Sequence, residues 1–130
     1  MSRKTIATLM QMKKEGEKIT MLTSYDASFT RVLEGAGVDS ILVGDSLGMV
    51  IQGQESTLPV SVDEMVYHTR CVARGRHEAL LIADMPFMSY SSADQAVSNA
   101  SRRRKDGGAR MVELEGGAPQ LETVRQLTMN

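Results

Sequence analysis

The chain has 130 residues, the size of one modest domain, and 42% hydrophobic with 24% charged residues is the composition of a globular protein. A formal net charge of −1 gives no electrostatic reason to expect a nucleic acid or an anionic membrane as partner. No apolar run approaches the roughly 18 residues of a membrane span, and the N-terminus lacks the apolar core of a secretory signal. Cys71 is the only cysteine, which excludes a disulfide framework, so we expect a cytoplasmic protein.

Short apolar runs alternate with helix-like stripes along the chain. Ile6, Leu9 and Met10 mark a predicted N-terminal helix. Four apolar runs of strand length predict strands at 19–22, 40–43, 79–83 and 111–114. The stretch after each run has apolar residues at helical spacing, which predicts helices at 29–36, 61–73, 92–100 and 121–127. Ser61 and Glu64 have the spacing of a capping box at the start of the second of these helices.

The predicted order is therefore a βα unit repeated four times behind an N-terminal helix. Strands with uninterrupted apolar runs are typical of a parallel sheet covered by helices. Two α/β architectures fit this order, an open doubly wound sheet and part of a (β/α)8 barrel, and the periodicity does not separate them. One feature disagrees with the pattern, because the apolar stripe of the third of these helices should continue at positions 103 and 104, which are both arginine.

Acidic residues follow the predicted strands, where α/β proteins place their functional groups. Asp26, Asp45, Asp84 and Glu115 stand after the first, second, third and fourth strands. Because neighbouring parallel strands lie about 4.8 Å apart, carboxylates at their ends can converge on one point. Oxygen ligands without His or Cys favour Mg²⁺ or a similar hard cation. Asp45 is the strongest candidate, since it opens a long loop, 46–61, of the kind that forms binding loops.

The ordinary alternative is that an acidic residue after a strand caps the next helix. The histidines and the cysteine are weaker candidates for a functional role. His68 is expected at the surface or in a second layer, His77 in solvent, and Cys71 as a small buried filler.

A family resemblance extends over nearly the whole chain. The motifs that carry it are Thr23-Ser24-Tyr25-Asp26, Val43-Gly44-Asp45-Ser46-Leu47-Gly48-Met49, Gln52-Gly53, Ser56-Thr57-Leu58-Pro59-Val60, Tyr67-His68-Thr69 and Ala83-Asp84-Met85-Pro86-Phe87-Met88. In this order and spacing they resemble the ketopantoate hydroxymethyltransferase (3-methyl-2-oxobutanoate hydroxymethyltransferase) family. The resemblance implies the N-terminal half of a (β/α)8 (TIM) barrel in a homo-oligomeric, cytoplasmic enzyme. It also implies transfer of a hydroxymethyl group from 5,10-methylenetetrahydrofolate to 3-methyl-2-oxobutanoate through a Mg²⁺-stabilised enolate, giving 2-dehydropantoate.

The resemblance also assigns roles to individual positions. Asp45, Asp84 and Glu115 match the family's metal-binding acidic residues, and Asp45, Ser46 and Asp84 match residues that bind the keto acid. Glu113 stands where the family has a lysine that contacts the substrate, and the stretch 101–110 is one residue longer than usual. The family's general base lies in the second half of the barrel, so no catalytic residue is assigned within this chain.

Length bears on which function is expected. A (β/α)8 barrel takes roughly 250 residues, so residues 1–130 are expected to form a single partial domain whose second half is absent. The chain is then a fragment, a truncated product or a half that needs a partner. Two alternatives stay open, a catalytically inactive relic or subunit and another Mg²⁺-dependent enolate lyase of the phosphoenolpyruvate/pyruvate barrel group. The motif at 43–49 favours the hydroxymethyltransferase over the lyase.

Overall fold

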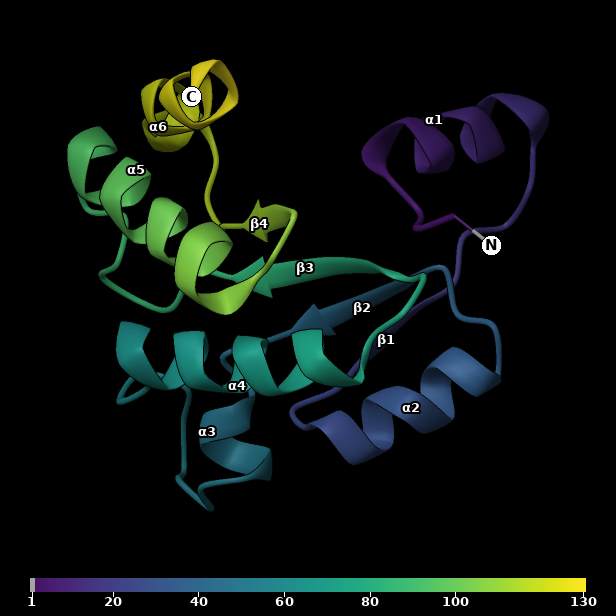
Figure 1. The fold of residues 1–130 in the computed structure, drawn as a ribbon. Coiled ribbons are helices and arrows are strands. Elements are labelled where there is room, and N and C mark those ends of the chain that lie inside the picture. The colour runs from purple at the N-terminus through teal and green to yellow at the C-terminus, as the bar shows by residue number, and fades with distance from the viewer. Residues whose placement is uncertain (1) are drawn as a thin grey trace.

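A computed structural model describes residues 2–130 and contains one four-stranded sheet (Figure 1). The strands are β1 (Met21–Thr23), β2 (Ser40–Val43), β3 (Leu80–Asp84) and β4 (Met111–Glu113). Each strand pairs in parallel with the next along the chain, in the order β1-β2-β3-β4. All four strands predicted from the apolar runs are confirmed.

Helices connect the strands, as the periodicity predicts. They are α1 (Ile6–Glu15), α2 (Ala27–Gly35), α3 (Leu47–Val50), α4 (Val62–Gly75), α5 (Ala93–Arg102) and α6 (Leu121–Met129), with a π-helical turn η1 (Arg103–Gly107) and a 3-10 turn η2 (Ala118–Gln120). The capping box at the start of α4 is present, since the Ser61 side chain accepts from the Glu64 backbone and the Glu64 carboxylate accepts from the Ser61 backbone. Within residues 2–130, no helix is long and apolar enough to cross a bilayer.

The helices between strands pack on one face of the sheet. In β2 and β3 the buried residues Ile41, Val43, Leu81 and Ala83 alternate with residues of the other face and join the core cluster that includes Met65 of α4. Val112 of β4 points to this same face, and together with Leu114, just beyond the strand, it packs against the cluster that contains Ala96 and Ala100 of α5. A doubly wound sheet has helices on both faces and reverses its strand order. The sequential order and one-sided helices instead match part of a (β/α)8 barrel.

The opposite face of the sheet is exposed at its two edge strands, whereas Leu80 and Ile82 of β3 are buried there. Met21 of β1 and Met111 of β4 are 49% and 43% exposed, although both are apolar. In a closed barrel this face is filled by layers of side chains from all eight strands. This face is therefore the concave, inward side of half a barrel.

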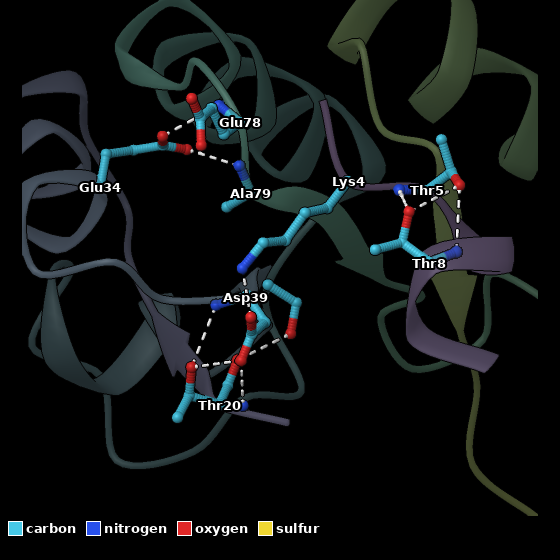
Figure 2. Close-up of polar contacts among 9 residues, drawn as sticks. Lys4, Thr5, Thr8, Thr20, Glu34, Asp39, Glu78 and Ala79 are labelled. Atoms are coloured by element: carbon cyan, nitrogen blue, oxygen red, sulfur yellow. Dashed lines mark hydrogen bonds and ion pairs between the residues drawn. The ribbon is translucent and has the colours of Figure 1, made fainter. Parts of the chain in front are cut away.

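The N-terminal segment is fastened to the end of the sheet where the strands begin (Figure 2). The Lys4 backbone donates to the Glu78 carbonyl at 2.7 Å, and the Lys4 ammonium pairs with Asp39 just before β2. Asp39 also accepts from the backbone and hydroxyl of Thr20, both at 2.8 Å. Burial raises the pKa of Asp39, but the bonds from Lys4 and Thr20 outweigh it and hold the pKa below its usual value. The helix α1 is thereby placed beyond the start of the strands.

Gly75 provides a test of the packing between α2 and α4. A Cβ at Gly75 would lie 2.5 Å from the Ala27 carbonyl oxygen, whereas a Cβ at Gly35 would meet nothing within 4 Å. We expect Gly75→Ala to lower the free energy of unfolding by about 1–3 kcal/mol, because backbone atoms cannot give way. Gly35→Ala, also at the last residue of a helix, should leave it unchanged or raise it by up to about 1 kcal/mol. Urea unfolding of both variants measures this, and equal effects would contradict the close approach.

Candidate active site

Asp45 and Asp84 meet at the carboxyl edge of the sheet. Asp84 is the last residue of β3, and Asp45 follows β2 after a single glycine, Gly44. The Asp45 backbone N–H donates to Asp84 Oδ2 at 3.3 Å. The two residues therefore lie side by side at the ends of neighbouring strands.

The electrostatics of this pair are unfavourable without a cation. The pKa of Asp84 is raised from 3.8 to about 7, because burial and the negative charges of Asp45 and Glu113 together outweigh the opposing effect of the Asp45 N–H. Close carboxylates of this kind are stabilised in the ionised state when a positive charge lies between them. The site therefore has the charge and the oxygen donors that suit a hard divalent cation.

Glu113 lies next to Asp84, since the two residues are partners in the pairing of β3 with β4. Glu115 is placed differently. No group of three or more His, Cys, Asp or Glu side chains that could hold a metal occurs within residues 2–130, so Glu115 is not joined to Asp45 and Asp84 as a third ligand. The strand β4 ends at Glu113, and beyond that residue the alternation of faces no longer fixes where a side chain points. Mg²⁺ is commonly held by one or two carboxylates together with water and substrate, so the pair alone fits this ion.

Ser46 is held by a chain of hydrogen bonds from two other elements. The Tyr25 hydroxyl and Ser46 Oγ lie 2.7 Å apart, and His68 Nδ1 of α4 lies 2.8 Å from the Tyr25 carbonyl oxygen. The Ser46 side chain makes no capping bond to α3, so its hydroxyl is oriented by Tyr25 instead. Tyr25 was not singled out by the strand-end argument, although it lies in one of the motifs that carry the resemblance.

The loop at 46–61 folds back against the start of α4. Leu47 is fully buried, and a Cβ at Gly48 would lie 2.6 Å from Val60 Cγ2, so only glycine allows this approach. Gln52 Nε2 donates to the Glu64 carboxylate at 2.8 Å. The expected long loop is thus present, but it contains the short helix α3 that the periodicity does not predict.

Arg103 explains the anomalous stripe of α5. Its side chain is fully buried, with Nε donating to the Asp84 carbonyl at 2.8 Å and Nη1 to the Asn99 carbonyl at 3.1 Å. The pKa of Arg103 is lowered to about 10, because burial outweighs the opposing effect of the Asp84 charge. A π-helical turn holds one residue more than an α-helical turn, and it begins at Arg103. This turn lies within the stretch 101–110, and Arg103 fixes the backbone behind Asp84.

The raised pKa of Asp84 predicts an unusual pH dependence of stability for the chain without a bound cation. Between its pKa in the unfolded chain, about 3.9, and about 7 in the fold, only the folded state holds the proton. The free energy of unfolding should therefore fall as the pH rises through this window. The full shift corresponds to about 4 kcal/mol, but the carboxyl is partly open to solvent, so we expect about 1–2 kcal/mol.

Urea unfolding at pH 5.0 and 7.5 in the presence of EDTA measures this effect. Asp84→Asn supplies the reference, because the amide does not titrate. An equal pH dependence in the parent chain and in Asp84→Asn would show that Asp84 ionises normally.

Comparisons with known proteins agree on one family. Residues 3–130 match the family model described as ketopantoate hydroxymethyltransferase. The 3-methyl-2-oxobutanoate hydroxymethyltransferase of Nitrosococcus oceani is 59% identical over 128 residues, covering 98% of this chain and 48% of that relative. The enzyme of the same name from Halorhodospira halophila is 55% identical over 126 residues, covering 97% and 46%. The chain spans about half the length of the curated relatives it matches.

Solved structures confirm the fold. A crystal structure of 2,3-dimethylmalate lyase, a member of the PEP mutase/isocitrate lyase superfamily, aligns with a TM-score of 0.71 at 14% identity. The alignment covers 95% of this chain and 47% of that structure, which has the (β/α)8 barrel of its superfamily. At this identity the likeness concerns the fold alone, and it matches the four βα units to half of a barrel.

Proposed function

Because the chain belongs to the ketopantoate hydroxymethyltransferase family, we propose that it contributes to hydroxymethyl transfer from 5,10-methylenetetrahydrofolate to 3-methyl-2-oxobutanoate, giving 2-dehydropantoate. The observation that supports this proposal is the pair of carboxylates at the carboxyl edge, Asp45 and Asp84, joined at 3.3 Å through the Asp45 N–H. This edge is where (β/α)8 barrel enzymes carry their active sites.

We propose Mg²⁺ as the cation, held by Asp45 and Asp84, without Glu115 as a third ligand. When bound, Mg²⁺ would polarise the 2-keto group of the substrate and favour the negative charge that develops when C3 loses a proton. The two carboxylates supply the oxygen donors, and Arg103 keeps Asp84 in position through its backbone carbonyl.

Ser46 is the proposed partner of the substrate carboxylate. Its hydroxyl is oriented by Tyr25, and Tyr25 in turn is fixed by His68, so the donor is held in place before the substrate arrives. Glu113 opposes binding of the anionic keto acid, because it adds a negative charge beside Asp84. No residue of this chain is proposed as the general base, which the family resemblance assigns to the second half of the barrel.

The remaining features of the family are also proposals for this protein. We propose 5,10-methylenetetrahydrofolate as the one-carbon donor, a homo-oligomeric assembly and a cytoplasmic location. They rest on the family and on the 55–59% identity to its curated members.

A fusion enzyme tests the proposed activity. Residues 1–130 are joined to the remaining half of the Nitrosococcus oceani relative, and 2-dehydropantoate is measured by mass spectrometry with keto acid, folate donor and Mg²⁺ present. We expect product only with Mg²⁺, none after EDTA, and background turnover from the 130-residue chain alone. Cleavage of 2,3-dimethylmalate without any hydroxymethyl transfer would favour a lyase, and a folded fusion inactive in both assays would favour an inactive relic.

A further inference from the structure

A cavity lies at the opposite end of the sheet from Asp45 and Asp84. Its volume is about 580 Å³, within the roughly 300–1,000 Å³ typical of small-molecule sites. Arg76 precedes β3 and Arg110 immediately precedes β4, which places the cavity where the strands begin. The charged side chains that line it are all cationic: Arg3, Arg76, Arg104, Lys105 and Arg110. Five positive side chains gather here in a chain whose formal net charge is −1.

Arg76 is the buried member of this group. It is only 6% exposed, its Nη1 donates to the Ala79 carbonyl at 2.9 Å, and its Nε has no hydrogen-bond partner in the described part of the chain. The carboxylate that acts on it, Glu34, is already engaged, because its two oxygens accept from the Glu78 and Ala79 backbones at 2.9 Å each (Figure 2). Burial and the charges of Arg3 and Arg110 lower the pKa of Arg76. A buried cation with an unused donor beside other cations is costly unless an anion joins them.

The π-helical turn supplies two more of the cations. Arg104 and Lys105 both lie in η1, and both are exposed on the cavity. Within the same turn Arg103 points into the core toward the Asp84 carbonyl, so this one segment contacts both ends of the sheet. Such π-helical insertions occur frequently at functional sites.

We propose that this cavity binds a small soluble anion carrying two or more phosphate groups. The planar guanidinium groups of arginine match phosphate oxygens in a two-bond geometry, and four of the five cations are arginine. The number of charges and the volume both exceed what one phosphate group requires. The site is separate from the proposed Mg²⁺ pair, so it adds a ligand to those of the proposed reaction.

Pyrophosphate is the probe that tests this site, by isothermal titration of the chain in 50 mM NaCl. We expect saturable binding, weaker binding in 300 mM NaCl, and at least about tenfold weaker binding of orthophosphate, which has fewer charges. Sulfate and succinate should also bind more weakly than pyrophosphate.

Exposed residues provide the variants, because substituting the buried Arg76 risks unfolding the chain. Arg104→Gln/Lys105→Gln should weaken pyrophosphate binding at least about tenfold, since it removes two charge-assisted partners. Arg31→Gln/Lys14→Gln removes the same amount of charge from α2 and α1, away from the cavity. This control should change the affinity for pyrophosphate by less than about threefold. Circular dichroism confirms that each variant stays folded.

Three results would overturn the proposal. The first is the absence of pyrophosphate binding by the folded chain. The second is an equal loss in both double variants, which would indicate only a long-range effect of net charge. The third is co-sedimentation with phosphatidylglycerol vesicles or binding to a short RNA when pyrophosphate does not bind, which would assign the cations to a macromolecular surface.

Discussion

Asp84→Asn should lower kcat/KM of the fusion enzyme by about 10³-fold or more when keto acid, folate donor and Mg²⁺ are supplied. The substitution keeps the shape of the side chain and removes the charge at the carboxyl edge. Electrostatic and Lewis-acid stabilisation by a bound cation is worth several kcal/mol, and each 1.36 kcal/mol is about tenfold in rate. Asp45→Asn should act similarly, because the two carboxylates share one site.

The structure separates this loss from simple unfolding. Because burial raises the pKa of Asp84, the neutral amide should leave the chain at least as stable as the parent at pH 7.5. Asp94→Asn, an exposed aspartate in the first turn of α5, is the matched control and should retain activity within about twofold. Titration of Mg²⁺ into each variant shows whether the loss of kcat/KM is accompanied by a loss of Mg²⁺ binding. A kcat/KM for Asp84→Asn within about tenfold of the parent would remove Asp84 from the site.

The strands and the start of α4 could be predicted because the sequence patterns that specify them are local. Ile41 and Val43 lie in an uninterrupted apolar run, and such runs are buried in parallel strands whatever the rest of the chain does. Ser61 and Glu64 satisfy one another within one turn, so their spacing alone is sufficient to place the start of α4. The edge position of Asp45 and Asp84 follows from the strands, since both residues stand at or just beyond a strand end.

The choice between two architectures could not be made from periodicity. The choice depends on which face of the sheet each helix covers. That face is set by how the chain crosses from one strand to the next, which periodicity does not specify. Met65 of α4 shares a cluster with Ile41, and Val112 packs against the cluster that contains Ala96 of α5, both on the same face, which decides the choice. The predicted stripe of α1 shows the same limit, because Ile6 and Met10 are exposed in the structure.

Two features of the site depend on contacts that sequence spacing does not reveal. The bond between Tyr25 and Ser46 joins residues 21 apart in the sequence, and it forms only because β1 and β2 are neighbours. Arg103 breaks the apolar pattern of its helix, and this violation was the one available signal. Its burial follows from the π-helical turn, whose position no local propensity specifies. Departures from a local rule often mark functional or strained positions, and Arg103 lies directly behind Asp84.

The charge at position 113 should control keto-acid affinity. Glu113 ends β4 in register with Asp84, and its negative charge is one of the causes that raise the pKa of Asp84. The proposed substrate is itself an anion, so Glu113 would both repel it and add to the charge that a cation must offset. The family resemblance places a substrate-contacting lysine at this position, and a lysine would reverse both effects.

Glu113→Lys in the fusion enzyme should therefore strengthen binding of 3-methyl-2-oxobutanoate by about 30- to 100-fold, because it changes the charge beside an anionic ligand by two units. Affinity for Mg²⁺ should stay similar or become weaker, since a positive charge now lies near Asp45 and Asp84. Glu113→Gln is the intermediate control and should give a smaller gain in keto-acid affinity. Isothermal titration of both ligands into the parent and the two variants measures the effect. Equal keto-acid affinity in all three would show that residue 113 does not face the substrate.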